Sequence, residues 1–192
     1  MQTIMNDHLP EPRSGLLGEW DKFVGPGQTR PEFWLIMLPA IAGGLALLCY
    51  ARWQGLPWSF WQYLVGMLLA FDLVGGVATN ATATAKRWYH RPGQTWRQHL
   101  GFIAVHAIQL FLVTWLFRNL DWAYFGAFYA YLLAASLMII FSPLNLQRPV
   151  ALLLVIGAVL LEDYGFPATR GMEWFVTVFF IKLLVSHLLK EA

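Results

Sequence analysis

Long runs of hydrophobic residues, separated by short polar connections, fill the chain from residue 33 onward. A helix needs roughly 20 mostly apolar residues to cross a bilayer, because the hydrocarbon core is about 30 Å thick and each residue rises about 1.5 Å. Six segments fit this pattern, and we expect transmembrane helices over residues 33–51, 60–83, 99–117, 122–141, 150–161 and 172–189. The pattern predicts an all-α, polytopic membrane protein in which residues 33–192 form a single six-helix transmembrane domain.

The fifth segment is the weakest of the six. Residues 150–161 are apolar without interruption, but these 12 residues reach spanning length only if Asp163, Tyr164 and Phe166 are included. A re-entrant segment, which enters and leaves the membrane on the same side, is the alternative interpretation.

Residues 1–32 form a polar tail that contains one amphipathic stretch. Apolar side chains recur there at helical spacing and end at the helix breaker Gly25-Pro26-Gly27. They are Leu16, Leu17, Trp20, Phe23 and Val24. We expect a short interfacial helix that lies on the inner membrane surface or packs over the cytoplasmic end of the bundle. Because the first apolar run follows about thirty polar residues, we expect no cleavable signal peptide.

The distribution of positive charge predicts the orientation of the helices, because Lys and Arg accumulate on the cytoplasmic side of a membrane. With six spans, nine cations fall on the side of both termini and three on the other side. The nine are Arg13, Lys22, Arg30, Lys86, Arg87, Arg91, Arg97, Arg148 and Lys190, and the three are Arg52, Arg118 and Arg170. Both termini are therefore expected in the cytoplasm.

The composition is typical of a membrane protein and excludes several other classes of protein. Hydrophobic residues make up 58% of the chain and charged residues 12%, against about a quarter charged in ordinary soluble domains. The net charge is +2 without a basic patch on a soluble face, so nucleic acid is not an expected partner. A single cysteine, Cys49, excludes a disulfide scaffold. We expect a bacterial-type inner membrane, with membrane lipid as partner; a homo-oligomer or a partner subunit is left open.

Ionisable residues inside the predicted spans point to a polar site, because each costs about 2.5 to 3.5 kcal/mol to insert at the centre of a helix. Asp72 is expected about 12 Å below the cytoplasmic end of its span and His106 about 10 Å below the start of the next, so the two share a depth. Lys182 lies about 7 Å deeper than His187 in the sixth span, at the level where Asp72 would find a counter-charge.

The spacing of polar residues extends this site toward the cytoplasm. Asp72 and Thr79 are seven residues apart, as are His99 and His106, so each pair is expected on one helix face. Consecutive antiparallel helices usually pack together. A cytoplasm-facing cleft lined by these four residues and by Asn80 is therefore predicted, with His90 in the connecting loop positioned to close over it. Structural alternatives are a polar lock between Asp72 and Lys182 and an interfacial position for His99. His187 could instead cap a helix or contact lipid headgroups, and His106 could have a purely structural role.

Metal-dependent hydrolysis of a lipid or small amphiphile is the first function that this set predicts. Asp72, His106 and either His90 or His187 could bind Zn²⁺ or another divalent metal with one position left for water. His99 is a further candidate ligand, although it lies about 10 Å from His106 along an ideal helix. Thr79, Asn80 or Lys182 would then polarise the substrate.

Several other functions are compatible with the same residues. Without a metal, Thr79 or Thr82 could act as nucleophile with His106 or His99 as base. Intramembrane charges also mark small transporters and proton relays, and a non-enzymatic scaffold or accessory subunit would use them to bind a partner helix. Arg87 and Arg91 in the basic loop are candidate contacts for lipid phosphates, and the same charges also set topology.

Overall fold

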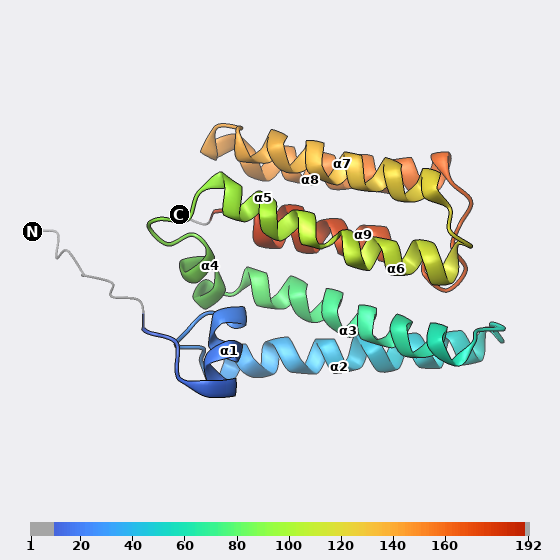
Figure 1. Ribbon diagram of the computed structural model, residues 1–192, viewed down its shortest axis with the longest axis horizontal. Helices are drawn as coiled ribbons and strands as arrows, with labels where there is room; N and C mark the ends of the chain where they lie inside the picture. The colour runs from blue at the N-terminus through green and yellow to red at the C-terminus, as the bar shows by residue number, and fades with distance from the viewer. Residues whose placement is uncertain (1–9, 191–192) are drawn as a thin grey trace, which may run out of the picture.

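The computed structural model describes residues 10–190 and shows a bundle of long helices that run along one common axis (Figure 1). Five helical segments are long and apolar enough to cross a membrane. They are α2 (Arg30–Trp53), α3 (Phe60–Ala81), the pair α5 and α6 over Trp96–Phe117, α7 (Trp122–Ile140) and α8 (Leu144–Gly165). No strand occurs among residues 10–190. The prediction of an all-α chain is confirmed, and the five helices indicate an integral membrane protein.

Helix α8 is longer than the apolar run that predicted it. It begins at Leu144, before Pro149, and continues for 22 residues to Gly165. Pro149 is the sixth residue of α8 and therefore lies inside the helix, which continues through it. With 22 residues the segment has full spanning length, and the alternative of a short re-entrant segment does not describe it.

The sixth predicted span is shorter than expected. Six residues of α9 (Phe175–Phe180) are followed directly by the seven residues of the π-helix η1 (Ile181–His187). This combined helix packs against α3, α7 and α8. Phe175, Phe179 and Phe180 are fully buried in the main hydrophobic core. The segment is thus the centre of the bundle rather than one of its lipid-facing helices.

The third predicted span is interrupted at its midpoint. Helix α5 (Trp96–Val105) ends before His106, and α6 (Ala107–Phe117) begins after it. The N–H of His106 donates to the carbonyl of Ile103 at 3.0 Å, which is the tighter bonding of a 3₁₀ turn. His106 therefore occupies a break between two helices that the sequence pattern presents as one.

Two short helices cover one end of the bundle. The predicted amphipathic helix is present as α1 (Gly15–Val24), with Leu16 and Leu17 exposed. It is joined to α4 (Ala83–Tyr89) because the indole of Trp88 donates to the carbonyl of Lys22 at 3.0 Å, and the Tyr89 hydroxyl donates to the carbonyl of Phe23 at 2.7 Å. Helix α1 thus packs on the bundle through its C-terminal half and leaves apolar side chains on its outer surface.

Capping boxes fix where three of the long segments start. In each, a Thr or Ser accepts from the backbone three residues later, and the Glu or Gln at that position accepts from the cap. The pairs are Thr29 with Glu32, Ser59 with Gln62, and Thr95 with Gln98. Glu32 also accepts from the Thr84 hydroxyl at 3.0 Å, which ties the start of α2 to α4. The end of the bundle that carries α1 and α4 is thereby held together.

Candidate functional site

Asp72 of α3 and Lys182 of η1 form an ion pair within the helix bundle. The Lys182 Nζ lies 2.8 Å from the Asp72 Oδ2, and Gln109 of α6 donates to the same oxygen at 3.3 Å. The Lys182 side chain is 3% exposed, whereas that of Asp72 is 35% exposed. The ammonium is therefore enclosed by protein, while the carboxylate also faces open space.

Gly76 makes room for this ion pair one turn after Asp72 on α3. A methyl group built at Gly76 would collide with Cε of Lys182 and would lie 2.9 Å from its Nζ. No larger residue fits there unless Lys182 moves. The absence of a side chain at Gly76 therefore provides the space that Lys182 occupies.

The π-helix η1 sets the direction of two functional candidates. Its widened turns bond residues five apart, as in the 3.2 Å bond from the Leu188 N–H to the Leu183 carbonyl. Lys182 and His187 are themselves five apart, so this geometry brings them closer to one face than an α-helix would. Both are buried, and single-turn π-helices often occur at functional sites.

His106 lines the site, and only one of its two ring nitrogens has a hydrogen-bond partner among residues 10–190. Its Nδ1 lies 2.7 Å from the carbonyl oxygen of Phe102, and a carbonyl oxygen can only accept. The proton of a neutral ring is therefore on Nδ1, and Nε2 carries the lone pair. An imidazole held in this way is ready to act as a base or as a ligand.

A cavity of about 190 Å³ joins these groups. It is lined by Phe23, Asp72, Gly76, Thr79, Asn80, Phe102, His106, Gln109 and Lys182. The structure thus brings together all four predicted catalytic residues and Asn80. The hydroxyl of Thr79 donates to the carbonyl of Gly75 at 2.8 Å, which engages its proton within the helix. We call this space the polar cavity.

A larger apolar groove of about 400 Å³ lies beside the polar cavity. Side chains of α1, α2 and α3 line it, among them Trp20, Ile36, Met37, Leu68 and Phe71. The groove and the polar cavity share four wall residues, which are Phe23, Asp72, Gly76 and Thr79. A molecule with a polar end and an apolar body could therefore occupy both.

Three of the predicted metal ligands gather at a different place. His99 Nδ1 lies 3.4 Å from His187 Nε2, and the rings of His90 and His99 stack with centroids 4.6 Å apart. His90 donates from Nε2 to the His187 carbonyl at 3.0 Å. Burial lowers the pKa of His90 to about 4. Phe102 stacks on His187 with ring centroids 3.9 Å apart and also lines the polar cavity.

The predicted metal set is consequently divided. Asp72 and His106 line the polar cavity, whereas His90, His99 and His187 form the separate histidine cluster. Among residues 10–190, no three His, Cys, Asp or Glu side chains are placed to hold one metal ion. His99 and His106 both face the α9–η1 helix, but at different levels: His99 contacts His187, whereas the His106 ring lies 6.5 Å from the ring of Phe179 between centroids.

The two arginines predicted to contact substrate lie outside the polar cavity. Arg87 donates to the Thr84 hydroxyl at 3.3 Å, and the Arg91 guanidinium stacks over the Trp88 ring at 3.7 Å. They belong to the surface around α4. Gln109, in contrast, contacts Asp72 directly and was not predicted, because a neutral amide within an apolar run gives a weaker sequence signal than a charge.

Comparison of the chain with protein-family models, with curated proteins and with solved structures finds no match.

Proposed function

We propose that this protein binds a small amphiphile from the membrane and hydrolyses it, with the polar end in the polar cavity and the apolar end in the groove of α1, α2 and α3. The observation that carries this proposal is the wall that the two spaces share at Asp72, Gly76 and Thr79. Ligand sites are typically apolar hollows with a few converging polar groups, and this arrangement has that composition.

The proposal includes six spans with both termini in the cytoplasm of a bacterial-type cell. Five spans would put the two ends of the chain on opposite sides, but α1 and the end of η1 lie at the same end of the bundle (Figure 1). Nine of twelve cations outside the spans belong to that end. The short α9–η1 helix acts as the sixth span within a sheath of longer helices.

The chemistry follows from the groups in the polar cavity. The Nε2 of His106 takes a proton from a water molecule while the water oxygen attacks the carbonyl carbon or phosphorus of an ester. The bond to the leaving oxygen then breaks, and His106 returns the proton to that oxygen. Lys182 stabilises the negative charge that develops on the ester, and Asp72 holds Lys182 in place.

The proposed reaction uses no metal ion, because the five predicted metal ligands are divided between the polar cavity and the histidine cluster. General acid and base catalysis of this kind contributes roughly 10² to 10⁴ in rate. His106 is thus expected to account for most of the turnover beyond substrate binding.

The test uses purified protein in a neutral detergent and p-nitrophenyl esters with short and long acyl chains. We expect His106→Ala to lower kcat by roughly 10² or more. The matched control is His99→Ala, which removes an imidazole from the histidine cluster and should leave kcat within a few-fold. Met37→Trp should raise KM for the long ester and leave the short ester unaffected, because Met37 lines only the apolar part of the site.

Equal losses in His106→Ala and His99→Ala would contradict a specific base in the polar cavity. Equal turnover of short and long esters, unchanged by Met37→Trp, would contradict the assignment of the groove to the apolar end.

A further inference from the structure

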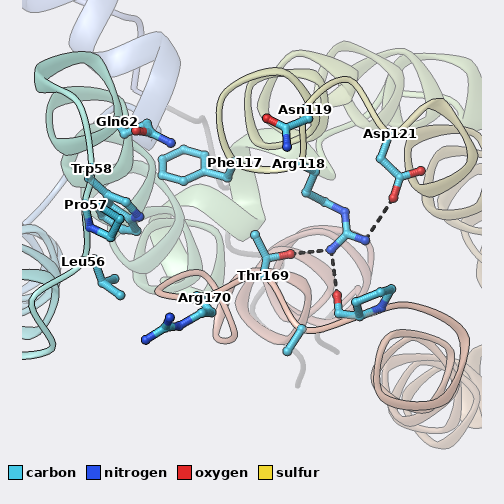
Figure 2. A pocket seen from close by; sticks show the side chains of 12 residues that line it. Leu56, Pro57, Trp58, Gln62, Phe117, Arg118, Asn119, Asp121, Thr169 and Arg170 are labelled. Carbon is cyan, nitrogen blue, oxygen red and sulfur yellow. Dashed lines mark hydrogen bonds and ion pairs between the residues drawn. The ribbon is translucent and has the colours of Figure 1, made fainter.

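A second cavity, of about 410 Å³, opens at the end of the bundle opposite α1. Most of its walls come from three connections that are distant in sequence, namely residues 54–59, 118–121 and 166–174, and Gln62 of α3 and Phe117 of α6 complete them (Figure 2). None of its lining residues also lines the polar cavity. Its volume lies within the range of about 300 to 1,000 Å³ that is usual for small-molecule sites.

Arg118 fixes the shape of this cavity. Its Nη1 donates to the carbonyl of Pro167 at 2.9 Å and to the hydroxyl of Thr169, and its Nη2 lies 3.0 Å from the Asp121 carboxylate. Figure 2 shows these three bonds on one side of the cavity, with Leu56 and Trp58 on the other. The Arg118 side chain is 7% exposed, and its Nε has no hydrogen-bond partner among the described residues.

The turn after Arg118 has an uncommon backbone conformation. Asn119 and Leu120 both have positive φ, at 50° and 62°, which is rare for residues other than glycine and especially for a bulky side chain. The Leu120 N–H donates to the carbonyl of Thr114 at 2.9 Å, which helps to hold the turn. Strain of this kind gathers at binding sites, and here it places Asn119 in the cavity wall.

The charges of the lining leave one cation available. Arg118 is matched by Asp121, whereas Arg170 is exposed and forms no ion pair with any of residues 10–190. The facing wall is apolar, with the rings of Trp58 and Phe117 packed edge to face at 5.0 Å between centroids. The cavity is therefore complementary to an anion that carries an apolar body.

We propose that this cavity binds the phosphate group of an anionic amphiphile, with Arg170 as the charged contact and the Trp58 wall against the apolar body. The cavity lies at the ends of the spanning helices, where phospholipid phosphates are found and where tryptophan is enriched. The ligand chemistry is a phosphate ester, supplied either by a membrane lipid or by a soluble compound. This site is separate from the polar cavity and does not depend on its function.

The test measures lipid retention by native mass spectrometry of the full chain in a neutral detergent. Phosphatidylglycerol and phosphatidylcholine with identical acyl chains are titrated separately, and inorganic phosphate is added as a competitor in a third arm. Arg170→Gln is compared with Arg52→Gln, a matched control, because Arg52 is an exposed arginine at the same end of the bundle and does not line the cavity.

We expect wild type to prefer phosphatidylglycerol. Arg170→Gln should lower the affinity for this lipid by about tenfold relative to Arg52→Gln, as expected for the loss of one charge-assisted hydrogen bond. Displacement by millimolar inorganic phosphate would support the same site with a soluble phosphate compound as its source. Equal losses in the two variants would overturn the proposal, because general surface attraction would then explain the binding. Absence of both a lipid preference and phosphate competition would overturn it as well.

Discussion

The ion pair between Asp72 and Lys182 predicts an asymmetric response to mutation, because its two members differ in exposure. Asp72→Asn leaves the ammonium of Lys182 uncompensated, and that side chain is only 3% exposed. Removing one partner of a buried pair typically costs about 3 to 5 kcal/mol. Part of the pair faces the polar cavity, so we expect a loss near 3 kcal/mol in the free energy of unfolding.

Lys182→Met leaves the Asp72 carboxylate without its ion-pair partner. The Asp72 carboxylate is 35% exposed and keeps its hydrogen bond from Gln109, so water and amide can compensate the lost ammonium. We expect a loss of about 1 kcal/mol, the size of an ordinary hydrogen bond. The double variant Asp72→Asn with Lys182→Met leaves no unpaired charge, and its loss should also be about 1 kcal/mol.

The free energy of unfolding is measured for wild type, the two single variants and the double variant. Each protein is unfolded in mixed micelles with increasing sodium dodecyl sulfate and followed by far-UV circular dichroism. The coupling energy from this double-mutant cycle should be about 3 kcal/mol. Two single variants of equal cost that add in the double variant would refute the reasoning, because the buried ammonium would then not depend on Asp72.

Three further predictions use the same unfolding assay. Burial lowers the pKa of His90 to about 4, against about 6.5 in an unfolded chain, so the unfolded chain binds a proton at a higher pH than the folded protein. The free energy of unfolding should therefore fall as the pH drops from about 6.5 toward 4. This fall should be smaller in His90→Gln. Gly171→Ala should cost roughly 1 to 3 kcal/mol, because Gly171 has φ of +86° and its new methyl group would collide with Trp58; a midpoint equal to wild type would contradict this. Glu32→Ala should cost about 1 to 2 kcal/mol through loss of the α2 capping box and of the bond to Thr84, whereas Glu32→Gln should retain most of the stability.

The apolar pattern predicted where the long helices lie, although it covered only residues 150–161 of the 22-residue α8. The start of α3 at Phe60 and that of α7 at Trp122 agree with the expected segments, because a capping residue precedes each apolar run. The pattern failed where helix geometry changes within an apolar run. Neither the break at His106 nor the π-helix over Ile181–His187 alters hydropathy, so a window average passes over both.

The contact between Asp72 and Lys182 was predicted from their depth in the membrane alone. Asp72 and Lys182 meet because charges at one level of a bundle have few other partners. Position along the helix axis separates the two histidines of α5 and its break, because seven residues span about 10 Å. His99 lies level with His187, whereas His106 lies level with Phe179 and lines the polar cavity.

The irregular features of the bundle are the reason why we propose a binding site rather than only a structural lock. A lock between Asp72 and Lys182 requires only two facing side chains in a dry contact. Here the helix break at His106 and the π-helix that carries Lys182 both border the same cavity, and each replaces regular helical bonding. The break leaves the His106 Nε2 with its lone pair, and the cavity continues into an apolar groove. Neither feature adds to the strength of an ion pair, and both shape a cavity that fits the amphiphile we propose.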